Sequence, residues 1–137
     1  MAFNKCVFIL GAGASVDAGA PVLNNFLIEA RKLLDNPHSG LTPDLRKAFE
    51  NVFKWRGHIY PTLKYLKINT DNLEELFSLI DMADLLGIDG SETVRDNLLD
   101  LIIHTLQLTI KIDVTNERVL PKPVYTTFVK LLLERTK

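Results

Sequence analysis

The sequence contains very little cysteine, no long apolar run and no excess of charge of either sign. Its single cysteine, Cys6, cannot form an internal disulfide, which excludes a disulfide-stapled secreted scaffold. No apolar run approaches the roughly 20 residues that span a bilayer, and the N-terminus does not resemble a cleavable secretion signal. The net charge of −1 at pH 7 argues against a nucleic-acid or membrane-surface partner held by a basic field. We therefore expect a cytoplasmic protein.

The composition itself is that of an ordinary globular protein. The chain has 137 residues, of which 47% are hydrophobic and 24% charged, and it shows no internal repeat or domain-splitting linker. A chain of this length can bury a sizeable core, so we expect a single domain at most.

The stretch from Cys6 to Pro21 is the most informative part of the chain. Its first five residues, Cys6–Leu10, form an apolar run of the length and composition of a strand buried on both faces. The run stops at Gly11, and small residues follow until Pro21 opens an expected helix. A strand, a glycine-rich turn and a helix N-terminus in this order form a recurring anion site, because glycine lets the backbone approach a phosphate closely. The pattern predicts a pyrophosphate cradle.

The longer motif is similar to the opening motif of the sirtuin superfamily, and closest to its SIR2-like branch. The similarity is carried by Gly11-Ala12-Gly13-Ala14-Ser15 and Ala18-Gly19-Ala20-Pro21, and more weakly by Asn72–Asp81. The resemblance implies an NAD-binding, Rossmann-like domain, and in the complete protein hydrolysis of NAD to nicotinamide and ADP-ribose, as in several effectors of anti-phage defence. The generic dinucleotide fingerprint is incomplete, because Val16 stands where its third glycine would be.

The resemblance also names the expected cofactor-binding residues: Gly11, Ala12, Gly13, Ala14, Ser15, Asp17, Gly19 and Pro21. Most would act through backbone N–H groups. For Ser15 the alternative is a helix N-cap, and for Asp17 it is a first-turn carboxylate that complements the helix dipole. Gly19 and Pro21 are expected to shape the loop and the start of the helix.

Zinc and protein deacylation are not expected. Deacylating sirtuins carry a zinc ribbon of four cysteines in two close pairs, which this chain cannot build. The three histidines do not cluster, and helix capping explains Asn72, Glu74 and Glu75 as well as a site role does. No catalytic residue can be assigned, and whether the chain is an enzyme stays open.

The sequence patterns in the rest of the chain predict helices. Helices are expected over 21–34, from Pro43 with Thr42 as N-cap, from Asp71 as N-cap, from 91 or 93 to about Thr109, and over 124–135. An interruption is expected at 55–61, followed by a short helical or irregular piece over 62–68. The expected fold class is α/β, a Rossmann-like SIR2 fold represented by its first strand and a mostly helical segment. One strand cannot make a parallel sheet, so residues 1–137 are expected to be the N-terminal portion of a single SIR2-like domain.

In that family the asparagine and histidine that act on NAD come later in the chain, so we expect them beyond Lys137. Two alternatives stay open: a non-catalytic sensor of NAD or ADP-ribose, and a helical interaction protein whose glycine turn is purely structural. The expected partners are NAD and a further copy of the chain, with neither nucleic acid nor membrane.

Overall fold

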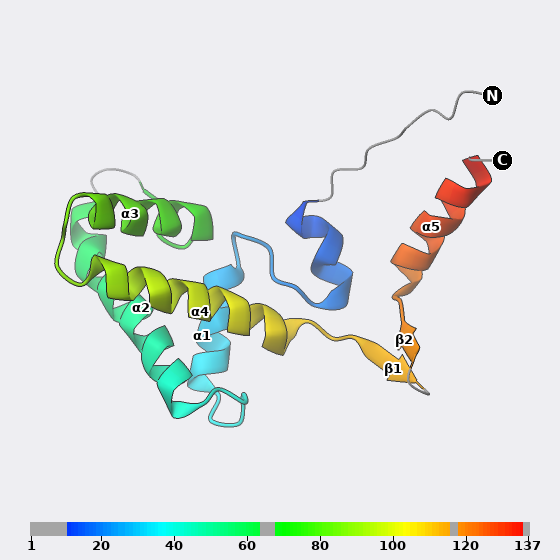
Figure 1. Ribbon diagram of the computed structural model, residues 1–137, viewed down its shortest axis with the longest axis horizontal. Coiled ribbons are helices and arrows are strands. Elements are labelled where there is room, and N and C mark those ends of the chain that lie inside the picture. The colour runs from blue at the N-terminus through cyan, green and yellow to red at the C-terminus, as the bar shows by residue number, and fades with distance from the viewer. Residues whose placement is uncertain (1–10, 64–67, 116–117, 136–137) are drawn as a thin grey trace.

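A computed structural model of the chain describes residues 11–63, 68–115 and 118–135 (Figure 1). The elements are a 3-10 helix, five α-helices and two short strands. In chain order they are η1 (Ala12–Ala18), α1 (Phe26–Asp35), α2 (Pro43–Leu63), α3 (Leu73–Leu85), α4 (Ser91–Thr109), β1 (Asp113–Thr115), β2 (Arg118–Leu120) and α5 (Pro123–Arg135). Helices α1 to α4 lie together at one end of the molecule, and α4 leads towards the hairpin and α5 at the other.

The core lies among helices α1 to α4, with α4 packed against α2, α3 and α1. Phe49 and Val52 of α2, Ile80 of α3 and Leu98 and Leu101 of α4 are completely buried. Each such side chain contributes about 1.5–3 kcal/mol when it leaves water. The apolar stripes of the sequence therefore face one another, as their helical spacing predicts.

The expected α/β, Rossmann-like fold with an incomplete parallel sheet is wrong. The described residues are mostly helical, and their sheet is a two-stranded antiparallel hairpin in which Val114 lies opposite Val119. The predicted first strand, Cys6–Leu10, lies outside the described residues. A parallel sheet needs further strands joined by crossovers. The apolar segments after Pro21 instead have helical periodicity and bury their stripes against each other.

Two of the predicted helix boundaries are confirmed. Helix α2 begins at Pro43, where the Thr42 hydroxyl accepts a hydrogen bond from the Leu45 amide at 3.3 Å. Helix α4 ends at Thr109, and the alternating apolar residues that follow lead into β1.

The expected interruption at 55–61 is wrong, because α2 continues to Leu63. The proline at position 61 cannot donate a hydrogen bond to the carbonyl four residues earlier, but only two residues of the helix follow it. The side chain of Arg56 also ties this part of α2 to the segment before α3. Its Nε donates to the Thr70 hydroxyl at 3.2 Å, and the guanidinium pairs with Asp71.

The helix expected from Pro21 begins later, at Phe26. Residues 21–25 form turns instead, in which the Asn25 amide donates to the Val22 carbonyl oxygen at 3.0 Å. The side chains of Ala20 and Pro21 are buried, so this connection is packed against the helices rather than open.

Candidate nucleotide-binding loop

The glycine-rich segment is folded into a short helix rather than an open turn. Gly11 is extended, with φ −85° and ψ 179°, and its carbonyl oxygen accepts the first hydrogen bond of η1, from the Ala14 amide at 2.9 Å. Gly19 ends the helix in the left-handed region at φ 94°, where its amide donates to the carbonyl oxygens of Ser15 and Val16. Only glycine adopts that conformation without strain.

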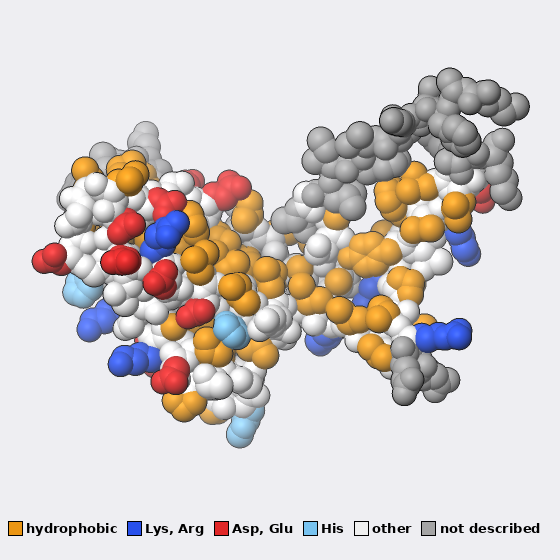
Figure 2. Space-filling view, in the orientation of Figure 1, with side chains coloured by type: hydrophobic (Ala, Val, Ile, Leu, Met, Phe, Trp, Pro, Cys, Tyr) orange, Lys and Arg blue, Asp and Glu red, His pale blue; other side chains and the backbone are white. Residues whose placement is uncertain are grey.

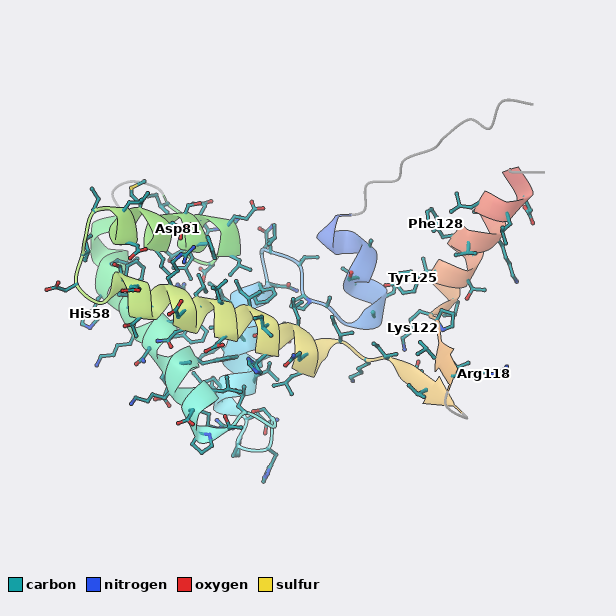
Figure 3. All side chains as sticks on the ribbon, viewed as in Figure 1. His58, Asp81, Arg118, Lys122, Tyr125 and Phe128 are labelled. Atoms are coloured by element: carbon teal, nitrogen blue, oxygen red, sulfur yellow. The ribbon has the colours of Figure 1, made fainter. Side chains whose placement is uncertain are left out.

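Three contacts hold this segment to distant parts of the chain. The Lys111 amide donates to the Ala18 carbonyl oxygen at 2.7 Å, just beyond the end of α4. A Cβ atom on Gly19 would lie 2.6 Å from the carbonyl oxygen of Thr109, so the backbones meet there at a distance that only glycine allows. On the other side, the hydroxyl of Tyr125 in α5 donates to the Ala14 carbonyl oxygen at 2.7 Å (Figure 3).

The side of η1 that carries the glycines and Ser15 faces solvent. Gly11, Gly13, Ser15 and Asp17 are exposed, and among the described residues no atom lies within 4 Å of a Cβ built on Gly11 or Gly13. The amides of Ala12 and Gly13 precede the first hydrogen bond of the 3-10 helix, as at any helix start. This side of η1 therefore offers main-chain donors, a hydroxyl and space beside the glycines.

The structure changes the interpretation of two polar residues of the loop. Ser15 lies inside η1, so it is not an N-cap. Asp17 lies in the last turn of η1, where a helix dipole disfavours a carboxylate, so the dipole explanation for Asp17 is wrong. Neither side chain has a structural role among the described contacts that would account for its position.

Asn72, the centre of the weaker motif, caps α3. Its side-chain oxygen accepts hydrogen bonds from the amides of Glu74 at 2.9 Å and Glu75 at 3.4 Å, so Asn72 and not Asp71 is the N-cap. The carboxylate of Glu75 reaches back and accepts from the Asn69 amide at 2.6 Å. Capping therefore accounts for these residues without a ligand.

The three histidines lie on different parts of the helical end. His58 is exposed on α2, His38 is exposed in the α1–α2 connection, and Nδ1 of His104 contacts the Asp100 carbonyl oxygen at 2.9 Å within α4. The described part of the chain has no group of three or more His, Cys, Asp or Glu side chains that could hold a metal ion.

Two open hollows lie elsewhere on the helical end. One of about 250 Å³ lies between α2 and α4, and one of about 390 Å³ lies between α1 and α2. In the second, the guanidinium of Arg31 lies 5.4 Å from the ring centre of Phe53. Neither of these two hollows is lined by residues 11–21.

Comparison of the chain with known proteins gave no match, whether to a protein-family model, a curated protein or a solved structure. Within the described ranges, no helix combines the length and apolar character needed to cross a membrane.

Proposed function

We propose that the chain binds NAD through residues 11–21, as part of a SIR2-like protein. The observation that carries the proposal is the match between Gly11–Pro21 and the SIR2-like opening motif, on a segment whose glycine face is exposed. The proposal concerns this loop and does not require a Rossmann-like sheet within the described residues.

The loop provides chemistry suited to a pyrophosphate. Backbone amides at Ala12 and Gly13 and the hydroxyl of Ser15 are hydrogen-bond donors, which is what phosphate oxygens require. The space beside Gly13 lets a ligand approach the backbone closely. Asp17 would repel a phosphate, so we assign its carboxylate to a ribose hydroxyl.

The proposed activity of the complete protein is hydrolysis of NAD to nicotinamide and ADP-ribose in the cytoplasm. In the family that the motif resembles, an asparagine and a histidine act on NAD, and we assign no residue of 1–137 to either role. A sensor that binds NAD without turnover is the alternative within the same site.

Calorimetric titration of the 137-residue chain with NAD, ADP-ribose and nicotinamide tests the binding. We expect NAD and ADP-ribose to bind and nicotinamide not to, because the loop would hold the pyrophosphate. Gly13→Val should weaken NAD binding at least about tenfold without changing the far-UV circular dichroism, since no described atom lies within 4 Å of the Cβ position at Gly13. NAD binding that is unchanged in folded Gly13→Val would refute the proposal.

A second measurement separates the hydrolase from the sensor. Nicotinamide release from NAD is followed with this chain and with the longest natural chain that contains it. Release by the longer chain alone supports the hydrolase and places its catalytic residues beyond Lys137. If NAD binds but neither chain releases nicotinamide, the result supports the sensor and excludes the hydrolase.

The second candidate function is that of a helical interaction protein, and a specific observation favours it. Gly19 already has a structural reason to be glycine, namely its left-handed backbone and its close approach to Thr109. Large apolar side chains are also exposed beyond α4 and at the end of α3. Monomeric proteins rarely expose large contiguous apolar patches, so such patches indicate binding surfaces. If the chain does not bind NAD, the helical interaction protein is the function that remains.

A further inference from the structure

The charge of the chain is divided between two segments, although its sum is close to zero. Residues 81–96 contain five carboxylates and one guanidinium, a net charge of −4. Residues 111–115 and 118–135 contain five basic and two acidic side chains, a net charge of +3. We call these segments the acidic end and the basic end.

The acidic end also carries an apolar patch. Met82, Leu85 and Leu86 follow one another at helical spacing in the last turn of α3 and just after it, and they are 57%, 88% and 71% exposed. Ile88 is brought back beside them because its amide donates to the Ala83 carbonyl oxygen at 3.0 Å. Figure 2 shows acidic side chains beside apolar ones over this end of the molecule.

The single cation of the acidic end does not neutralise it. Nε of Arg95 donates to the Asp81 carboxylate at 2.8 Å, and this hydrogen bond is the main reason that the pKa of Arg95 is raised. The charges of Asp84 and Asp96 raise that pKa further. An apolar patch with a negative rim remains.

The basic end has the complementary character. Lys111 is exposed just before the hairpin, Arg118 on β2 and Lys130 on α5. Apolar side chains are exposed between them, among them Val119 at 63% and Leu131 at 54%.

The two ends cannot meet within one copy. Helix α4 begins at Ser91 in the acidic end and finishes at Thr109, two residues before the basic end, and its 19 residues span about 28 Å. Because α4 packs against three other helices, it keeps the ends apart, and Figure 1 shows α3 and α5 at opposite sides of the molecule.

We propose that the basic end of one copy docks on the acidic end of a second copy, so that the chain associates head to tail. Both ends expose apolar area, and each end carries the charge that the other lacks, so opposite fields on the two patches fix their orientation. A head-to-tail contact uses two different surfaces. A pair of copies therefore still has one free acidic end and one free basic end, so that further copies can add beyond the dimer. This inference rests on the two ends and not on the glycine loop, so it stands or fails separately from NAD binding.

Sedimentation velocity of the 137-residue chain over a range of concentrations tests the proposal. The weight-average mass is expected to rise past that of a dimer, and raising NaCl from about 50 mM to 500 mM should weaken association at least about tenfold, because salt screens exposed charges. A mass that stays at the monomer, or that stops at a dimer, would overturn it.

Two double variants test the surfaces: Leu85→Ser with Leu86→Ser at the acidic end, and Val119→Ser with Leu131→Ser at the basic end. All four side chains are at least half exposed, so the variants should fold, as circular dichroism will verify. Each variant alone is expected to stay monomeric at concentrations where the parent associates. An equimolar mixture should form a capped pair, because one intact acidic end and one intact basic end remain.

Ile28→Ser is the matched control. Ile28 is 52% exposed on α1, away from both ends, so its replacement should leave association unchanged. If Ile28→Ser abolishes association as the double variants do, or if the mixture stays monomeric, the head-to-tail contact is refuted.

Discussion

Replacing Gly19 by alanine is expected to detach the glycine-rich segment from the end of α4. Alanine at φ 94° costs about 1–2 kcal/mol, because the left-handed region places Cβ against the following carbonyl. The new Cβ would also lie 2.6 Å from the Thr109 carbonyl oxygen, so the two backbones must separate. Separation breaks the hydrogen bond from Lys111 to Ala18, which contributes about 1 kcal/mol. We expect a local loss of about 2–3 kcal/mol.

Amide hydrogen exchange measures this loss directly. The protection of the Lys111 amide should fall about 30- to 160-fold, at about 1.4 kcal/mol for each factor of ten. The amide of Leu101, in the middle of α4, should keep its protection, because its side chain belongs to the core of α1 to α4.

Gly13→Ala is the matched control for this prediction. Gly13 lies in the same helix, its φ is outside the left-handed region, and no described atom lies within 4 Å of the added Cβ. Its effect on Lys111 should be within about 0.5 kcal/mol. Equal protection of Lys111 in Gly13→Ala and Gly19→Ala would refute the assignment of the close contact to Gly19.

Two further predictions concern the helical end. The Thr105 hydroxyl is completely buried in α4 and has no hydrogen-bond partner among the described residues, so Thr105→Val should stabilise the fold by about 1 kcal/mol and raise Tm by about 3 °C; a lower Tm would show that the hydroxyl is satisfied. Asn72→Ala should cost about 1 kcal/mol in urea unfolding, because the amides of Glu74 and Glu75 lose their acceptor. Asn72→Asp keeps an acceptor and should restore the stability, and equal losses in both variants would contradict the capping role.

Much of the helical end could be predicted from the sequence because its signals are local. Thr42 and Pro43 mark a helix start within two residues, and the spacing of Leu98 and Leu101 places them on one face. The end of α2 was less predictable, since the aromatic and glycine residues at 55–61 resemble a breaker. The side chain of Arg56 fixes this region through Thr70, and that contact is not visible in the local pattern.

The fold class could not be predicted for a related reason. A strand is defined by a partner that can lie anywhere in the chain, and the apolar run before Gly11 contains no information about that partner. The contacts that hold the candidate loop could not be predicted from the sequence either. No local pattern around Tyr125 indicates that its hydroxyl would donate to the Ala14 carbonyl oxygen.

The bond between Tyr125 and Ala14 also has a consequence for the order in which the chain folds. It joins residues 111 positions apart, whereas the core of α1 to α4 is complete in sequence by Thr109. Chain synthesis proceeds from the N-terminus, and distant contacts must wait for the intervening chain. The helical core can therefore form while η1, made long before, still lacks Lys111 and Tyr125. The glycine-rich segment is among the first parts to leave the ribosome and among the last to acquire its neighbours.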